Sequence, residues 1–348
     1  MQLLLDKIKE AYKNNLPFVA YNKPNETNVF GVFQKDATLH TITTDFTQTG
    51  FVFAPFNKSE KTVFFPLDES DFIKDSFSKQ QLHFKEKSFY NDASKATHIE
   101  IVQKSIDGIN KTDFKKVVIS RKEIIALNGV EVAVIYNRLV HLYANAFVYV
   151  WFHPQVGLWF GATPETLLKV ENNYFTTMSL AGTQVFKKGK KVTWNPKEIE
   201  EQQIVTDYIL NKLSNFSTNL NQLQTETVKA GSLLHLRTEI KGKLPQEALF
   251  SLVNLLHPTP AVCGLPKEAA KQFILENENY NRSYYTGYLG ELNSNATNDS
   301  HLFVNLRCME VKNEYAEIYV GGGITKESDP EKEWEETVAK SNIMLKAL

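Results

Sequence analysis

The carboxylates in the last third of the chain are spaced as a divalent-cation site requires. Glu333 and Glu336 lie three residues apart on a helix expected over 330–347, and Glu201 lies far upstream on a helix expected over 196–214. Carboxylate oxygens are the ligands that Mg²⁺ prefers, and Mg²⁺ usually keeps only one or two of them beside waters and substrate. The pattern therefore indicates an enzyme whose substrate brings its own negative charge to the metal.

Each carboxylate also has an ordinary interpretation. Glu201 shares the apolar face of its helix with Val205, where an unpaired charge would be costly, but near the first turn it could stay wet and be favoured by the helix dipole. Glu336 and Lys340 are four residues apart, as in a surface ion pair worth a few tenths of a kcal/mol. The spacing alone leaves a solvated helix face as the alternative.

Three further segments could bind or protonate a substrate. The strand that ends at 321–323 carries three glycines, which weaken a strand unless a ligand must approach its backbone; the alternative is a plain turn. Lys116 opens an apolar strand, where desolvation would lower its pKa from about 10.4 and suit it as a general base; the alternative is a solvated strand end. Glu165 follows a turn and could serve as a general acid if burial raised its pKa.

The elements that must position these residues are runs of strands separated by runs of helices. Strand signals occur between residues 18 and 67, and strands are expected over 114–120, 146–153, 157–161, 166–171, 174–180, 284–291, 301–310 and 314–323. Helices are expected over 3–13, 97–111, 128–144, 196–214, 221–231, 246–254 and 330–347, and surface helix and loop over 68–95. This order predicts an α+β fold with largely antiparallel sheet.

Composition excludes several classes of protein. The 348 residues carry a formal net charge of −1, without the basic excess of a nucleic-acid-binding surface. The two cysteines, Cys263 and Cys308, have no metal-ligand spacing, which favours a reducing cytoplasm. Charges interrupt the first ten residues where a signal peptide would be apolar, and no apolar run approaches the length of a membrane span. We expect a soluble, cytoplasmic monomer.

Together these segments closely resemble the chorismate-utilising enzymes and, within them, isochorismate synthase. The resemblance is strong over about residues 95–348 and loose over the first ninety. It rests on residues 116–121, 161–165, 180–183, Glu201 with 205–207, 257–261, Arg282 with Tyr285 and Gly287, 306–307, 321–324, and Glu333, Glu336, Thr337 and Lys340. It implies two large, mainly antiparallel sheets packed as a sandwich and flanked by helices. We expect one domain over 1–348, with a less typical part at 1–95 and the catalytic core at 96–348.

The resemblance also implies a role for each site residue. Lys116 aligns with the general base and Glu165 with the general acid, while Glu201 and Glu336 align with the Mg²⁺ ligands and Glu333 with a ligand acting directly or through water. The substrate-binding residues implied are Ala181, Gly182 and Thr183 near the ring carboxylate, Tyr285, Arg307, Gly321 and Gly322 around the enolpyruvyl carboxylate, Lys340 facing the metal-bound carboxylate, and His257 as the site histidine.

The implied reaction is a Mg²⁺-dependent isomerisation of chorismate to isochorismate, for menaquinone or siderophore biosynthesis. Water attacks ring carbon C2 and the 4-hydroxyl leaves, so no glutaminase subunit is expected. Alternatives are a salicylate synthase, which also eliminates pyruvate, an ammonia-using anthranilate or aminodeoxychorismate synthase, and a non-catalytic relative. One departure is Gln202-Gln203, where relatives often carry His or Glu; we expect it to tune the helix surface and not the metal.

Overall fold

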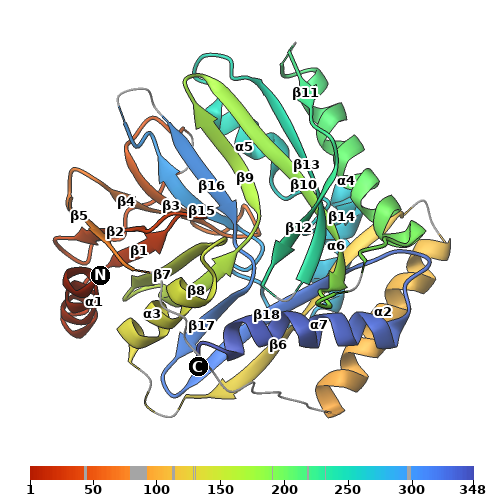
Figure 1. Ribbon diagram of the computed structural model, residues 1–348, viewed down its shortest axis with the longest axis horizontal. Coiled ribbons are helices and arrows are strands. Elements are labelled where there is room, and N and C mark those ends of the chain that lie inside the picture. Colours follow the sequence, from red (N-terminus) through yellow and green to blue (C-terminus); the bar gives the residue numbers. More distant parts are fainter. Residues whose placement is uncertain are drawn as a thin grey trace.

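Two antiparallel β-sheets pack against each other at the centre of the molecule (Figure 1). The computed structural model describes residues 1–348 except 43–44, 79–91, 112–113, 128, 130, 190, 218, 232 and 296–298. The strand pairings within both sheets are antiparallel throughout the described part of the chain. This confirms the predicted α+β fold of two large, mainly antiparallel sheets.

The strands of each sheet come from distant parts of the chain. The first sheet runs β14 (Gly264–Leu265), β6 (Lys116–Ala126), β18 (Tyr315–Ile324), β17 (Cys308–Lys312), β8 (Gly157–Thr163), β7 (Phe147–His153), β1 (Phe18–Asn22), β2 (Asn28–Gln34) and β5 (Ser70–Ser76). The second runs β11 (Asn221–Gln222), β13 (Leu233–Lys243), β10 (Tyr174–Val185), β9 (Thr166–Glu171), β16 (Ser300–Val304), β15 (Tyr288–Leu292), β3 (Gly50–Ala54) and β4 (Val63–Pro66), with β12 (Glu226–Ala230) also paired to β13.

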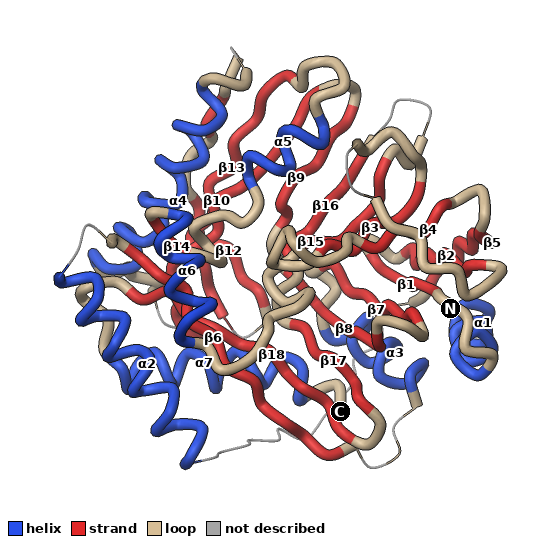
Figure 2. The backbone as a smooth tube through the Cα atoms, turned by 180° about the vertical axis from the view of Figure 1, so that it is seen from behind, coloured by secondary structure: helices blue, strands red, loops and turns tan. Residues whose placement is uncertain are grey.

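Helices cover the outer faces of both sheets. They are α1 (Gln2–Lys13), α2 (Asp92–Lys111), α3 (Val132–Leu142), α4 (Pro196–Ser214), α5 (Leu249–Leu256), α6 (Lys267–Asn277) and α7 (Pro330–Leu345). The apolar faces of α1, α3 and α7 pack on the first sheet, whereas those of α4 and α5 pack on the second. Figure 2 shows the path of these helices from behind. No helix among the described residues is long and apolar enough to cross a membrane.

The layer between the sheets is mainly aromatic because alternate residues of each strand point inwards. In β7, Phe147, Tyr149 and Trp151 belong to this layer, while Val148 and Val150 belong to the core under the helices. Such alternation follows from the two-residue period of a strand. The large side chains on both faces of β7 explain why its sequence is apolar throughout.

Two segments differ from the sequence prediction because their structure depends on pairing with distant strands. The predicted helix over 221–231 is wrong: β11 and β12 occupy it, and both pair with β13, which the sequence analysis omitted. Surface helix and loop was expected over 68–95, but β5 pairs with β2 there, and residues 79–91 lie outside the described chain. β5 is an edge strand with charged, exposed positions, so its sequence lacks the apolar signal of a central strand.

A third difference creates part of the site. The strand expected over 301–310 is two strands, β16 in the second sheet and β17 in the first. The crossing between them includes Arg307, whose φ of 48° is in the left-handed region. The break in the strand places the Arg307 side chain between the sheets.

Candidate active site

A cavity of about 70 Å³ lies where β10, β18, α4 and α7 meet the crossing between β16 and β17. Most of the predicted site residues line it: Glu165, Ala181, Gly182, Thr183, Glu201, Tyr285, Arg307, Gly321, Gly322, Glu336 and Lys340. A neighbouring cavity of about 500 Å³ shares Thr183 and Glu336 with it and is also lined by Lys197 and Glu333. The cavity thus brings together predicted site residues from distant parts of the chain, and Glu165 and Lys340 are 175 positions apart in the sequence.

Glu165 is a buried carboxyl held between β8 and β9. Its side chain is 3% exposed, and no ion pair with it is found in the described chain. Burial raises the pKa of Glu165 to about 8, although the positive charges of Lys116, Arg307 and Lys340 lower it in part. The carboxyl is therefore protonated at neutral pH, as a general acid must be.

Lys116 and Glu201 form a buried ion pair beside this cavity. The Lys116 ammonium is fully buried and donates to Glu201 Oε1 at 2.9 Å, so it reaches the cavity wall only through that carboxylate. Gly323 faces the pair, and a Cβ atom at that position would lie 2.4 Å from Glu201 Oε1 and 2.9 Å from Lys116 Cε. The glycine on β18 leaves the space that both side chains occupy.

Glu333 and Glu336 approach the same strand from α7. A Cβ on Gly322 would lie 3.2 Å from Glu333 Oε2 and 3.6 Å from Glu336 Oε1. Lys197 donates to Glu333 at 2.5 Å and Lys340 donates to Glu336 at 2.6 Å. Burial and the nearby charge of Glu336 raise the pKa of Glu333. The carboxyl groups of Glu333 and Glu336 thus lie close together, and each is paired with one lysine.

The carboxylates fit a hard cation by their chemistry, because all the donors are carboxylate oxygens gathered around Gly322 and Gly323. As the side chains stand, no three acidic, histidine or cysteine groups in the described ranges are grouped closely enough to hold a metal ion. Each of the three glutamates faces a lysine instead. The donor chemistry fits a hard cation but the present side-chain positions do not form a site, so Glu201, Glu333 and Glu336 stay a prediction as metal ligands.

Arg307 is held by His235, a residue that was not among the predicted site residues. The His235 Nδ1–H donates to the Gly182 carbonyl at 3.1 Å, and Nε2 accepts from Arg307 Nη2 at 3.2 Å. Burial, followed by the charges of Arg307 and Lys340, lowers the pKa of His235 well below its usual range. The neutral ring can thus orient the guanidinium, whose buried Nη1 has no hydrogen-bond partner within the described residues.

His235 was not predicted as a site residue, because no strand was predicted over the segment that carries it. It lies on β13, opposite Thr183 of β10. A sequence signal existed: the buried run of residues 233–236 would have suggested a strand, and pairing with 180–185 would then have placed the histidine at the site.

His257 was predicted as the site histidine, but it lies outside the cavity lining. Its ring packs edge-on against Tyr288 with centroids 5.0 Å apart, and it does not line the cavity. Ala261 and Val262 of the same loop do line it. The structure therefore brings this loop to the site through its apolar residues, with the histidine ring in the wall behind.

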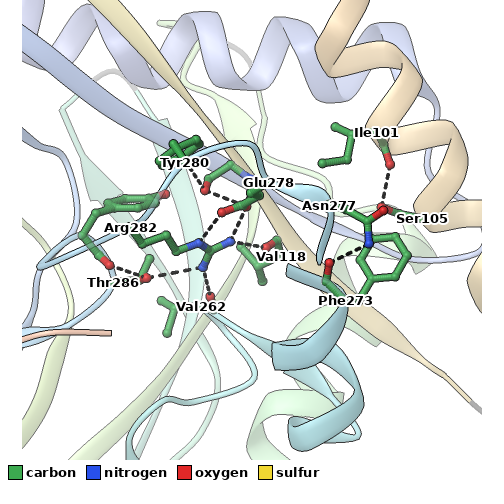
Figure 3. Close-up of polar contacts among 12 residues, drawn as sticks. Ile101, Ser105, Val118, Val262, Phe273, Asn277, Glu278, Tyr280, Arg282 and Thr286 are labelled. Carbon is green, nitrogen blue, oxygen red and sulfur yellow. Dashed lines mark hydrogen bonds and ion pairs between the residues drawn. The ribbon is translucent and has the colours of Figure 1, made fainter. Parts of the chain in front are cut away.

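Arg282 fixes three cavity-lining segments, as Figure 3 shows. It forms a buried two-point ion pair with Glu278, and its guanidinium donates to the carbonyls of Val118 and Val262 and to Thr286. Tyr285 follows on the same loop, and its hydroxyl would lie 2.9 Å from a Cβ on Gly321. Breaking this buried pair would loosen the loop that presents Tyr285.

Gln202 was expected to tune the surface of its helix, but the structure buries it. The side chain is 3% exposed, and its amide lies within hydrogen-bond distance of Ser179, Thr206 and Thr238 hydroxyls. It links α4 to β10 and β13, directly beside Glu201. Sequence pattern placed it on the surface because the hydroxyl partners come from strands that contact the helix only in the folded chain.

Comparison with known proteins gives a family. Residues 52–348 match the family model described as chorismate binding enzyme. The vibriobactin-specific isochorismate synthase of Vibrio cholerae is 32% identical over 198 residues, which are 54% of this chain and 50% of that protein. The chain thus spans about half the length of such curated relatives.

Solved structures show the same fold. DhbC of Bacillus anthracis, assigned as a 2,3-dihydroxybenzoate-specific isochorismate synthase, superposes with a TM-score of 0.82 at 24% identity, covering 99% of both chains. Anthranilate synthase component I of Streptococcus pneumoniae has a TM-score of 0.68 at 19% identity, covering 94% of this chain and 90% of that one. The fold is therefore shared by proteins with different named activities.

Proposed function

The chain belongs to the chorismate binding enzymes, and from this membership we propose that it is an isochorismate synthase that uses Mg²⁺. The observation that carries the proposal is the buried Glu165 carboxyl, whose pKa is raised to about 8. It lies in the same cavity as Arg307, whose Nη1 has no hydrogen-bond partner among the residues that the structure describes. A protonated acid and an anion-binding guanidinium suit a dianionic substrate with a hydroxyl leaving group. The name of the Vibrio cholerae relative supports this choice of activity.

Binding of the substrate would use both ends of the cavity. Arg307, held by His235, can donate to the enolpyruvyl carboxylate through Nη1, which has no partner in the described part of the chain. Tyr285 and Gly321 line the same cavity. Gly182 has a positive φ of 71°, and its missing side chain lets Glu198 of α4 pack closely against it. The 181–183 segment lines the cavity and would contact the ring carboxylate there.

Glu201 and Glu336 would hold Mg²⁺, with Glu333 acting directly or through water. When bound, the cation supplies positive charge that draws electron density from the ring carboxylate. The lysines that face these glutamates would keep the neighbouring protein charge balanced.

Proton transfers fall to two residues of the chain. Glu165 would donate its proton to the departing 4-hydroxyl, since it is buried and protonated at neutral pH. Lys116 would accept a proton from the water that attacks C2, which requires its ion pair with Glu201 to open and its ammonium first to lose a proton to solvent. Water would be the nucleophile, so neither glutamine nor a second subunit is needed.

The test is a turnover assay with purified protein, chorismate and Mg²⁺, with products separated by chromatography. We expect isochorismate, and chorismate when isochorismate is supplied, because the reaction only moves a hydroxyl and shifts ring double bonds. Salicylate with stoichiometric pyruvate would show a salicylate synthase. An amino-containing product formed with ammonium would show an ammonia-using enzyme, and no product would indicate a non-catalytic relative.

A further inference from the structure

A separate cavity of about 550 Å³ lies on the other side of α7, between α2, β6 and the loop that follows α6. It shares no lining residue with the two cavities of the candidate active site. Its volume is in the range of small-molecule sites. Apolar contact area is available from Ile101, Ile124 and the ring of Tyr280.

Two buried side chains in its wall have nitrogen atoms without partners. His98 on α2 is 2% exposed, and neither ring nitrogen has a hydrogen-bond partner within the described residues. Arg121 on β6 is 7% exposed, and its Nη2 is likewise without a partner in that part of the chain. Buried donors are normally satisfied, so two in one wall indicate a missing acceptor.

The rest of the Arg121 side chain is firmly held. Its Nε donates to Thr337 at 2.9 Å, its Nη1 pairs with Glu123, and the guanidinium stacks on Trp334 at 4.1 Å. The ring of His98 lies 5.9 Å from the same Trp334. The two orphan donors are therefore preorganised by α7 and do not depend on a flexible side chain.

The surrounding charges permit an anion. Lys104 and Lys122 line the cavity with Arg121, and Lys122 pairs with Glu317. Of the acidic residues in the wall, Glu278 is neutralised by Arg282, as Figure 3 shows, and Glu100 is exposed to solvent on α2. No unbalanced buried carboxylate among the lining residues opposes a bound anion.

We propose that this cavity binds a small carboxylic acid with a ring or other apolar body. The N–H groups of His98 and Arg121 Nη2 would donate to the carboxylate, and the apolar body would lie against Ile101 and Tyr280. Two fixed donors match the two oxygens of a carboxylate, whereas phosphate presents more acceptors than this wall can satisfy. The inference does not rest on the proposed function, because this cavity shares no lining residue with the candidate active site. The two sites are neighbours, since Ser120 of β6 pairs with Gly321 of β18.

Benzoate is the probe, titrated by calorimetry into the full-length protein. We expect binding with a dissociation constant of about 1 mM or tighter, and none to the uncharged isostere benzamide. His98→Phe keeps the ring volume and removes the donor, so it should weaken binding at least about tenfold. Lys104→Gln, on an exposed side chain, should weaken it about two- to threefold.

Two control variants separate this cavity from the active site. Gln103→Ala changes an exposed residue of α2 outside the cavity, and Arg307→Ala removes the proposed carboxylate ligand of the active site; both should retain benzoate binding. Melting curves verify that each variant is folded. Loss of binding in Arg307→Ala with retention in Lys104→Gln and His98→Phe would overturn the proposal, as would equal binding of benzamide or no binding of benzoate.

Discussion

The two ends of the candidate active site differ in whether their carboxyl groups are paired with lysines. At one end Glu165 is buried without an ion pair in the described chain, and burial raises its pKa to about 8. At the other end Glu201, Glu333 and Glu336 each face a lysine at 2.5–2.9 Å. Glu165 is thus a neutral acid without an ion pair in the described chain, whereas Glu201 and Glu336 are paired with lysines. Glu333 is intermediate, because it pairs with Lys197 while burial and the charge of Glu336 raise its pKa. This difference supports our proposal that the first end donates a proton and that the second binds charge.

The strongest test of the charged end is removal of the metal. Chelation with EDTA should abolish isochorismate formation, and added Mg²⁺ should restore it. Glu201→Gln should lower kcat by about 10³-fold or more, because a bound cation contributes several kcal/mol to the transition state. Glu200→Gln, on the exposed neighbour, is the matched control. Full activity after exhaustive chelation would show that the lysines alone balance this end.

The acid end should respond to loss of its proton. Glu165→Gln keeps the volume and removes the acid, and we expect kcat to fall roughly 10²–10⁴-fold, the usual range for a positioned proton donor. Lys116→Ala should fall within the same range if the amine serves as the base. Steady-state kinetics with chorismate measures both. A near wild-type kcat in either variant would contradict its assigned role.

The pH profile sharpens the comparison. A general acid works only when protonated, and the pKa of Glu165 is raised to about 8, so activity should be lost as the pH rises through that value. We expect kcat/KM to fall about tenfold per pH unit above it. In Glu165→Gln the residual activity should lack this alkaline limb. If Glu165→Gln still lost activity with the same dependence on alkaline pH, another group would be responsible for the pH dependence.

The smallest expected effect concerns His235. His235→Phe removes the acceptor of Arg307 Nη2 while retaining a ring, and it should raise KM about tenfold with a modest change in kcat if the guanidinium binds ground and transition states alike. Arg307→Ala should raise KM further. A fall in kcat with an unchanged KM would instead place His235 in the chemical step.

Some of the site followed from local sequence alone. Helix 196–214 was predicted with the bounds that α4 has, because Asn195 caps it, Pro196 suits its first turn and its apolar residues recur with helical period. The three glycines of 321–323 also indicated, from the sequence alone, a strand whose backbone a ligand could approach closely. Once the family was recognised, most of the residues that line the cavity could be named.

Tertiary structure decided the rest, because burial and pairing join residues that are distant in sequence. Lys116 and Glu201 are 85 positions apart, and they form an ion pair only because the fold places Glu201 of α4 beside Lys116 of β6, in the space left by Gly323 of β18. The pairing of β12 with β13 replaced the predicted helix, and the pairing of β13 with β10 brought His235 to Gly182. The sequence determined which residue types were available, whereas the packing of the sheets set which carboxyl is neutral, which are charged, and which donors remain free.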